Sequence, residues 1–276
     1  MNPGDAPQDL DYLGHLASSS ARFVEVLAQA PAGARVPTCP DWDVDDLLWH
    51  LGQVQWFWAA IVGRGLTVEA DVEALARPPR PATRVELRRH FCRASGDLQR
   101  NLRDTCPDTS AWTWSHEQTV GFILRRQAHE ALIHRIDAEL TTGNRTRMDP
   151  ELSTDGVDEA LGFMGPGIAG RGSLLPEHAS TVQVRTSDTD RAWSVTLGLP
   201  SATHHDGGAR DEAHAPVVVS SGVTSDAGPS AAATMSGTAA DLDCLLWHRP
   251  TTGKIARAGD PLVLGRFEEV VAGDHL

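Results

Sequence analysis

The sequence predicts an α+β protein: an amino-terminal four-helix bundle followed by a small domain of strands and helices. Up to about residue 145, apolar residues recur at helical spacing. From residue 180 onward, segments alternate between apolar and polar residues, as strands do. Between these regions, polar residues, glycine and proline cluster in residues 141–156. We therefore expect two domains, residues 1–147 and residues 148–276.

Four helices are expected in the first domain, separated by proline-rich breaks at residues 30–42 and 78–82. The second one opens on acidic residues, which suit a helix amino terminus. The connections between these four helices are too long to assume a simple up-down bundle. The expected helices cover residues 9–29, 43–63, 84–103 and 119–141.

The second domain is expected to contain a hairpin, further strands and terminal helices. Thr238 and Asp241 have capping-box spacing before an apolar run, which predicts a helix start. The glycine-rich residues 164–178 lack the spacing of a phosphate-binding loop and are interpreted as a connection. The expected strands are 180–188, 191–199, 216–222 and 231–235, and the other expected helices are 153–164 and 262–272.

Composition and charge exclude several classes of protein. The net charge is −13, from 24 basic and 37 acidic residues, which argues against binding to nucleic acid or to an anionic membrane. No apolar run approaches the length of a membrane span, and the first residues lack the features of a secretion signal. The four cysteines are scattered without a C-x-x-C pair, so we expect a cytoplasmic protein without a disulfide framework.

The stretch RRQAHEALIHRIDAEL, residues 125–140, resembles a metalloprotease H-E-x-x-H motif with one residue too many. His129 and His134 are five residues apart and would lie about 140° apart around a helix, so they cannot easily share a metal. Glu130 and His134 are four apart and neighbours on one face, and Asp137 continues that stripe. This face is either half of a metal site or an ordinary solvated Glu–His pair.

His50 could complete such a site, because helical bundles build metal sites from side chains on facing helices. It lies on the inward stripe of the helix at 43–63, where a histidine with a satisfied hydrogen bond is the alternative. With Glu130 and His134 it would form a three-ligand set with an open position. His204, His205 and His214 could also bind a metal, but residues 201–216 have the composition of a loop between strands.

Three segments resemble the mycothiol-dependent maleylpyruvate isomerase family, whose first domain is a DinB-like metal-binding bundle. VPTCPDWDVDDLLWHLGQVQWFWA is similar to the family's C-P-x-W and L-x-x-H-L-G patterns, and RRQAHEALIHRIDAE to its E-x-x-x-H-R-x-D-A-E pattern. SGTAADLDCLLWHR is similar to a segment of its carboxy-terminal domain. The resemblance covers nearly the whole chain.

The resemblance implies metal ligands at His50, Glu130 and His134, with zinc or another divalent metal, and mycothiol as the thiol cofactor. Arg249 matches an arginine that assists thiol or substrate binding in the family. Asp137 either orients a ligating histidine or forms a salt bridge with Arg126 or Arg135.

The implied partners are mycothiol and a small electrophilic substrate, and the protein is expected to be a monomer or a small homo-oligomer. The implied reaction is cis–trans isomerisation, or S-transfer if the thiol adduct is retained. Two alternatives stay open: a hydrolase that activates water on the same ligands, and a non-catalytic metal-binding regulatory protein.

Overall fold

The computed structural model describes residues 10–164, 180–197, 217–221 and 231–273, with backbone alone for 163–164 and 217–221. The chain falls into two compact units that meet between Arg147 and Met148. Helices and two small sheets make up the structure, so the predicted α+β class is confirmed. That residues 1–147 and 148–276 behave as independent domains stays a prediction.

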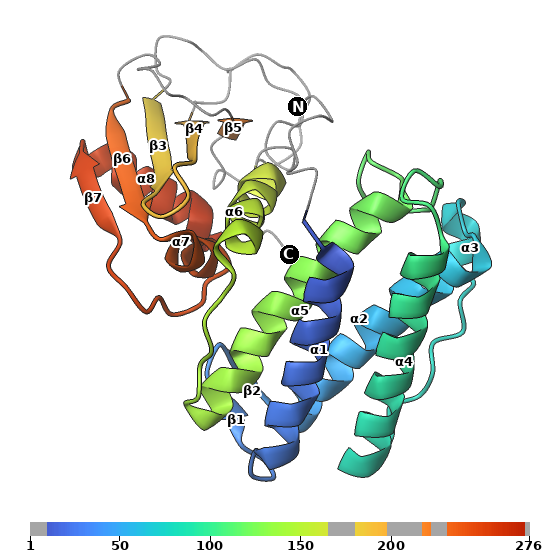
Figure 1. Cartoon of the computed structure of the whole chain (residues 1–276). Coiled ribbons are helices and arrows are strands. Elements are labelled where there is room, and N and C mark those ends of the chain that lie inside the picture. Colours follow the sequence, from blue (N-terminus) through green and yellow to red (C-terminus); the bar gives the residue numbers. More distant parts are fainter. Residues whose placement is uncertain (1–9, 165–179, 198–216, 222–230, 274–276) are drawn as a thin grey trace, which may run out of the picture. The chain divides into compact units, whose positions relative to one another are not determined.

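The first unit is built around four long helices (Figure 1): α1 (Tyr12–Gln29), α2 (Val44–Arg64), α4 (Arg84–Asp104) and α5 (Val120–Thr142). Helix α2 packs chiefly on α4, and α1 on α5. A five-residue helix, α3 (Glu69–Glu73), follows α2. A two-stranded antiparallel sheet of β1 (Arg35–Val36) and β2 (Cys39–Asp43) connects α1 to α2 along the chain. It contacts both α2 and α5.

The long helices of this unit begin at residues whose side chains satisfy free backbone N–H groups. Asp43 ends β2 and caps α2, accepting from the N–H groups of Asp45 and Asp46, while its own N–H donates to the Asp46 carboxylate. Thr83 forms the same reciprocal box with Glu86 at the start of α4. These caps fix where the helices start. They therefore also fix the direction in which each later side chain points around the helix axis.

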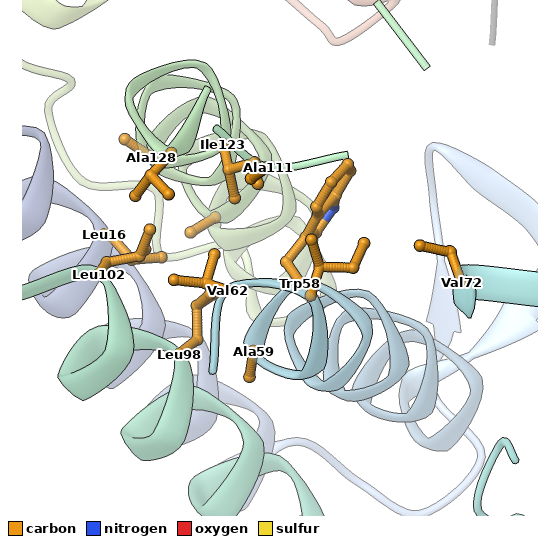
Figure 2. Packing of buried hydrophobic residues seen from close by; sticks show 13 residues of the cluster. Leu16, Trp58, Ala59, Val62, Val72, Leu98, Leu102, Ala111, Ile123 and Ala128 are labelled. Carbon is orange, nitrogen blue, oxygen red and sulfur yellow. The ribbon is translucent and has the colours of Figure 1, made fainter. Parts of the chain in front are cut away.

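The bundle core consists of aliphatic side chains and one tryptophan, most of them from the four long helices, with Val72 of α3 and Ala111 of the connection before α5 (Figure 2). Leu16, Ile61, Leu98 and Ile123 have no more than 1% of their surface exposed. Figure 2 shows Trp58 and Val62 of α2 facing Ile123 and Ala128 of α5. A second cluster, with Phe23 and Phe91 at its centre, lies under the β1–β2 hairpin.

The second unit contains a five-stranded sheet of order β5-β4-β3-β6-β7. Strands β3 and β6 run parallel and the other neighbours antiparallel. The elements are α6 (Pro150–Met164), β3 (Ser180–Thr186), β4 (Ala192–Leu197), β5 (Val217–Ser221), β6 (Ala233–Gly237), α7 (Ala239–Leu246), β7 (Ala256–Gly259) and α8 (Pro261–Ala272).

Asp241 in the first turn of α7 ties this helix to the loop that follows it. Its carboxylate accepts from the backbone N–H groups of Thr252 and Gly253 and from the hydroxyl of Thr238, the cap of α7. Burial alone would raise the pKa of Asp241, but these hydrogen bonds lower it below its ordinary value. The predicted helix start at Thr238 is confirmed.

The predicted long helices and the hairpin at 180–199 are confirmed within a few residues. The strand expected at 231–235 runs instead from Ala233 to Gly237. The sequence did not predict β1, β2, α3 or β7. The loop interpretations of residues 164–178 and 201–216, which include His204, His205 and His214, fall almost entirely outside the described residues.

Candidate metal centre

Helix α5 carries two of the three predicted ligands and the predicted supporting carboxylate. Thr119 caps its amino terminus, and Gly143, with φ of +70°, ends it in the left-handed conformation that glycine adopts without strain. Between them, Glu130, His134 and Asp137 follow each other at helical spacing on one face.

His50 reaches this face from helix α2. Its Nε2 lies 3.6 Å from Oε1 of Glu130, and the His134 Nε2 lies 3.1 Å from the same oxygen. One donor atom from each of the three residues falls within 4.8 Å of the other two. Within the described residues this is the one cluster of histidine, cysteine and acidic side chains with such geometry.

These separations fit a divalent metal. Zinc binds imidazole nitrogen and carboxylate oxygen at 2.0–2.2 Å, which in a tetrahedron places two ligand atoms about 3.3 Å apart. The two distances at the Glu130 oxygen lie on either side of that value. Two imidazoles and one carboxylate are the protein ligands of open, catalytic zinc sites. The residues present therefore fit the metal that the sequence predicts.

Arg126 keeps the carboxylate of Glu130 ionised. Its guanidinium lies 2.5 Å from Oε2 of Glu130, one turn earlier on α5. Burial alone would raise the pKa of Glu130, but the charge of Arg126 and the imidazoles of His134 and His50 hold it well below its usual range. Glu130 thus presents one oxygen to the histidines and the other to Arg126.

Asp137 orients His134 through the nitrogen that faces away from the cluster. Its Oδ2 lies 2.8 Å from Nδ1 of His134, and its Oδ1 accepts a 2.6 Å hydrogen bond from the Thr38 hydroxyl. With Nδ1 engaged, Nε2 is the nitrogen left to coordinate, the usual arrangement of a metal-bound histidine. Of the two roles open to Asp137 in the sequence, the structure shows this contact with His134.

The two acidic neighbours also set the charge of His134. Burial alone would lower the pKa of His134, but its hydrogen bonds to Asp137 and Glu130 and their negative charges raise it to about 9. With no metal bound, the imidazole is therefore protonated at neutral pH. A metal ion that coordinates Nε2 must displace that proton.

Three other candidates contribute no atom to the donor set. His129 is buried, with its ring inclined at 72° to that of Tyr12 at a centroid distance of 6.3 Å, and it contributes no atom to the donor set. Cys39, which forms no disulfide, lies at the start of β2 and packs against the second core cluster of the bundle. Arg249 follows α7 in the second unit, where its guanidinium donates to the Trp247 carbonyl oxygen at 2.5 Å.

Three neighbours of the site escaped the sequence analysis. Arg126 stands four residues before Glu130, a spacing that favours an ion pair, yet it was considered only as a partner of Asp137. Thr38 and Trp42 come from the hairpin that was interpreted as a proline-rich break. Thr38 is 99 residues from Asp137, so no local pattern connects the two.

Comparison with known proteins finds one family model that matches the bundle. The family model described as the mycothiol maleylpyruvate isomerase N-terminal domain matches residues 13–139, which include all three candidate ligands. Among solved structures, a crystal structure of the mycothiol-dependent maleylpyruvate isomerase with a histidine-to-alanine substitution aligns with a TM-score of 0.54. The alignment covers 90% of this chain and 92% of that chain at 13% identity, a likeness of fold. No curated protein matches the sequence.

Proposed function

We propose that this chain, whose residues 13–139 match the family model described as the mycothiol maleylpyruvate isomerase N-terminal domain, is a metal-dependent enzyme that uses mycothiol as a thiol nucleophile. Its substrate is a small electrophile with an activated cis double bond. The observation that carries this proposal is the convergence of His50, Glu130 and His134, with Asp137 behind the last of them.

The first requirement of this reaction is a deprotonated thiol. A free thiol has a pKa near 8.5 and is mostly protonated at neutral pH. A divalent metal, for which zinc is our candidate, supplies the charge that keeps a coordinating thiol deprotonated. The three protein ligands contain no sulfur and leave at least one position of a four-coordinate metal for an added ligand.

Metal binding changes the net charge of the donor cluster. Without a metal, the negative charges of Glu130 and Asp137 are balanced by Arg126 and by the protonated imidazole of His134. A divalent ion that replaces the His134 proton would leave these groups with one net positive charge, which favours a thiolate over a neutral thiol. We therefore expect thiolate to bind when the site holds the metal.

The reaction follows from the nucleophile. The thiolate adds to one carbon of the cis double bond, and the displaced electron pair moves onto the conjugated carbonyl oxygen. Rotation about the new single bond is then free, and expulsion of the thiolate restores the double bond in the trans form. If the adduct is retained instead, the same site performs S-transfer.

Arg249 is our candidate in the second unit for binding the thiol or the substrate, because a guanidinium pairs well with a carboxylate. An Arg249→Met variant should raise the KM for mycothiol or substrate while its zinc content stays that of the wild type. A KM unchanged for both would remove Arg249 from the site.

Activity with and without the thiol tests the proposed function. Zinc-loaded protein should turn over maleylpyruvate or a related cis-configured electrophile with mycothiol, and metal-free protein should not. Turnover that needs metal but not mycothiol would replace the proposal with a hydrolase that activates water. Metal binding without turnover of any electrophile would point to a regulatory protein.

Cobalt substitution tests thiol binding separately from catalysis. Mycothiol added to the cobalt protein should produce a sulfur-to-metal charge-transfer absorption. The band should persist in Cys39→Ser, because the protein ligands contain no sulfur, and be lost in His50→Ala together with the metal. A thiol without mycothiol's sugar portion should need a higher concentration. No band at saturating mycothiol would refute thiol coordination.

A further inference from the structure

The β1–β2 hairpin contacts His50 directly and is linked to His134 through Asp137. Thr38, between its two strands, donates to Asp137, which in turn holds His134. Trp42, four residues later on β2, lies with its ring centroid 4.8 Å from that of His50. None of these hairpin atoms belongs to the donor set itself.

The Thr38 contact fixes the rotation of the Asp137 carboxylate. Asp137 is fully buried, and its two oxygens have different partners, one the Thr38 hydroxyl and the other Nδ1 of His134. A carboxylate held at one oxygen can present the other in a single direction. Loss of the hydroxyl would remove one of the hydrogen bonds that hold the Asp137 carboxylate in this rotation, and a buried oxygen would lose that donor.

The Trp42 contact acts on the other histidine. The Trp42 and His50 rings are inclined at 44°, and the His50 and His134 rings are also 4.8 Å apart, at 72°. His50 therefore lies between an aromatic ring on one side and its fellow ligand on another. This packing limits the rotation of an imidazole that is otherwise partly exposed.

The hairpin is itself anchored to the two helices that carry the metal ligands, α2 and α5. The N–H of Val44 donates to the Ala34 carbonyl, and β2 runs without a break into α2 at the Asp43 cap. The hairpin also packs on α5. One element is thus joined to both helices that carry ligands.

We propose that the β1–β2 hairpin sets the geometry of the metal centre, with Thr38 as the positioning residue of His134 and Trp42 as that of His50. The inference rests on the proposed metal site. It assigns a function to the C-P-x-W segment, Cys39–Trp42, beyond a link between helices.

Zinc affinity of the purified full chain, measured by chelator competition, tests the role of Thr38. Thr38→Val should weaken zinc binding about tenfold, the lower end of the effect of removing such supporting groups. Thr38→Ser, which keeps the hydroxyl, should bind within about threefold of the wild type. Thr141→Val is the matched control, because its hydroxyl donates to the Ala138 carbonyl on the same helix and not to the site.

A double-mutant cycle separates positioning from a general loss of stability. In an Asp137→Asn background, Thr38→Val should cause no further loss of zinc affinity, since Thr38 acts through Asp137. For Trp42, Trp42→Phe should retain zinc affinity and Trp42→Leu should lose about tenfold. The absorption bands of the cobalt-loaded Thr38→Val and Trp42→Leu proteins should shift, which reports a change of ligand geometry.

Three results would overturn the proposal: zinc affinity of Thr38→Val within twofold of the wild type, an equal loss in Thr141→Val, or additive effects in the cycle. Wild-type protein that fails to bind zinc or cobalt would instead refute the metal site. The two failures are therefore distinguishable. Melting of the metal-free variants identifies any that lose zinc because they unfold.

Discussion

Replacement of His134 and His129 by alanine, one at a time, distinguishes the two ways of interpreting the histidine-rich stretch of α5. Both side chains are buried, with 7% and 1% of their surface exposed. Each substitution thus removes an imidazole from the interior of the same helix. Only His134 belongs to the donor cluster, so a difference between the variants in zinc binding reports the cluster alone.

The expected magnitude follows from linkage between binding and folding. Free zinc at a hundred times its Kd stabilises the wild-type fold by about 2.7 kcal/mol. At roughly 2–4 °C per kcal/mol for a protein of this size, Tm rises by about 5–11 °C. Loss of a ligand should cost at least the hundredfold upper limit for a supporting group, or about 2.8 kcal/mol. The same zinc then stabilises His134→Ala by only about 0.4 kcal/mol, near 1 °C.

Thermal melts with and without zinc measure this effect, and each variant's own metal-free Tm serves as its baseline. Wild type and His129→Ala should show the full rise, and His134→Ala close to none. The reasoning is refuted if His129→Ala loses the rise and His134→Ala keeps it. Zinc content after dialysis should give the same order, about one ion per chain in the first two proteins.

Two further predictions concern the domains and the carboxy-terminal unit. A fragment ending at residue 148 should stay helical by circular dichroism and bind zinc but lack turnover; full activity would show that the second unit is dispensable. Asp241→Asn should lower stability by about 1–3 kcal/mol at pH 7. The pKa of Asp241 is depressed in the fold, so its contribution is complete above its unfolded pKa of about 3.9 and disappears as pH falls through the folded value. The Tm difference from wild type should therefore vanish in strong acid, and a difference independent of pH would contradict this account.

The sequence predicts the long helices from apolar residues at helical spacing. In the structure Asp43 and Thr83 cap two of them, and Thr238 caps the shorter α7. Strand β7 shows no such signal, because its four residues, Ala256–Gly259, are all exposed and do not alternate. It exists through its pairing with β6, which is a tertiary contact.

The β1–β2 hairpin was missed for a different reason. Pro37 and Pro40 demote a strand prediction, since proline removes a backbone donor. A two-stranded sheet tolerates them because each strand has a free edge. The parallel pairing of β3 with β6 was equally inaccessible, because strand order depends on contacts that no local pattern records.

The part of the site that lies on one helix was easier to predict than the contacts between helices. Glu130, His134 and Asp137 share a face of α5, so their proximity follows from helical spacing. The placement of His50 beside them depended on the pairing of α2 with α5, which was expected because bundles build metal sites from facing helices and which the family resemblance then implied. The hydrogen bond of Thr38 to Asp137 joins a loop to a helix far along the chain, and neither spacing nor composition points to it.

The reciprocal cap at Asp43 has a mechanical consequence for the enzyme. His50 stands seven residues beyond this cap, a lever of about 10 Å, so a tilt of roughly 5° at the pivot would displace it by about 0.9 Å. Metal–ligand distances tolerate only about 0.2 Å. Asp46, which closes the cap, is itself held by Arg80 at 2.6 Å from the connection before α4. Substitutions at Arg80, a surface residue without metal-binding chemistry, would thus change the tilt of α2 and, through it, the position of His50 in the metal centre.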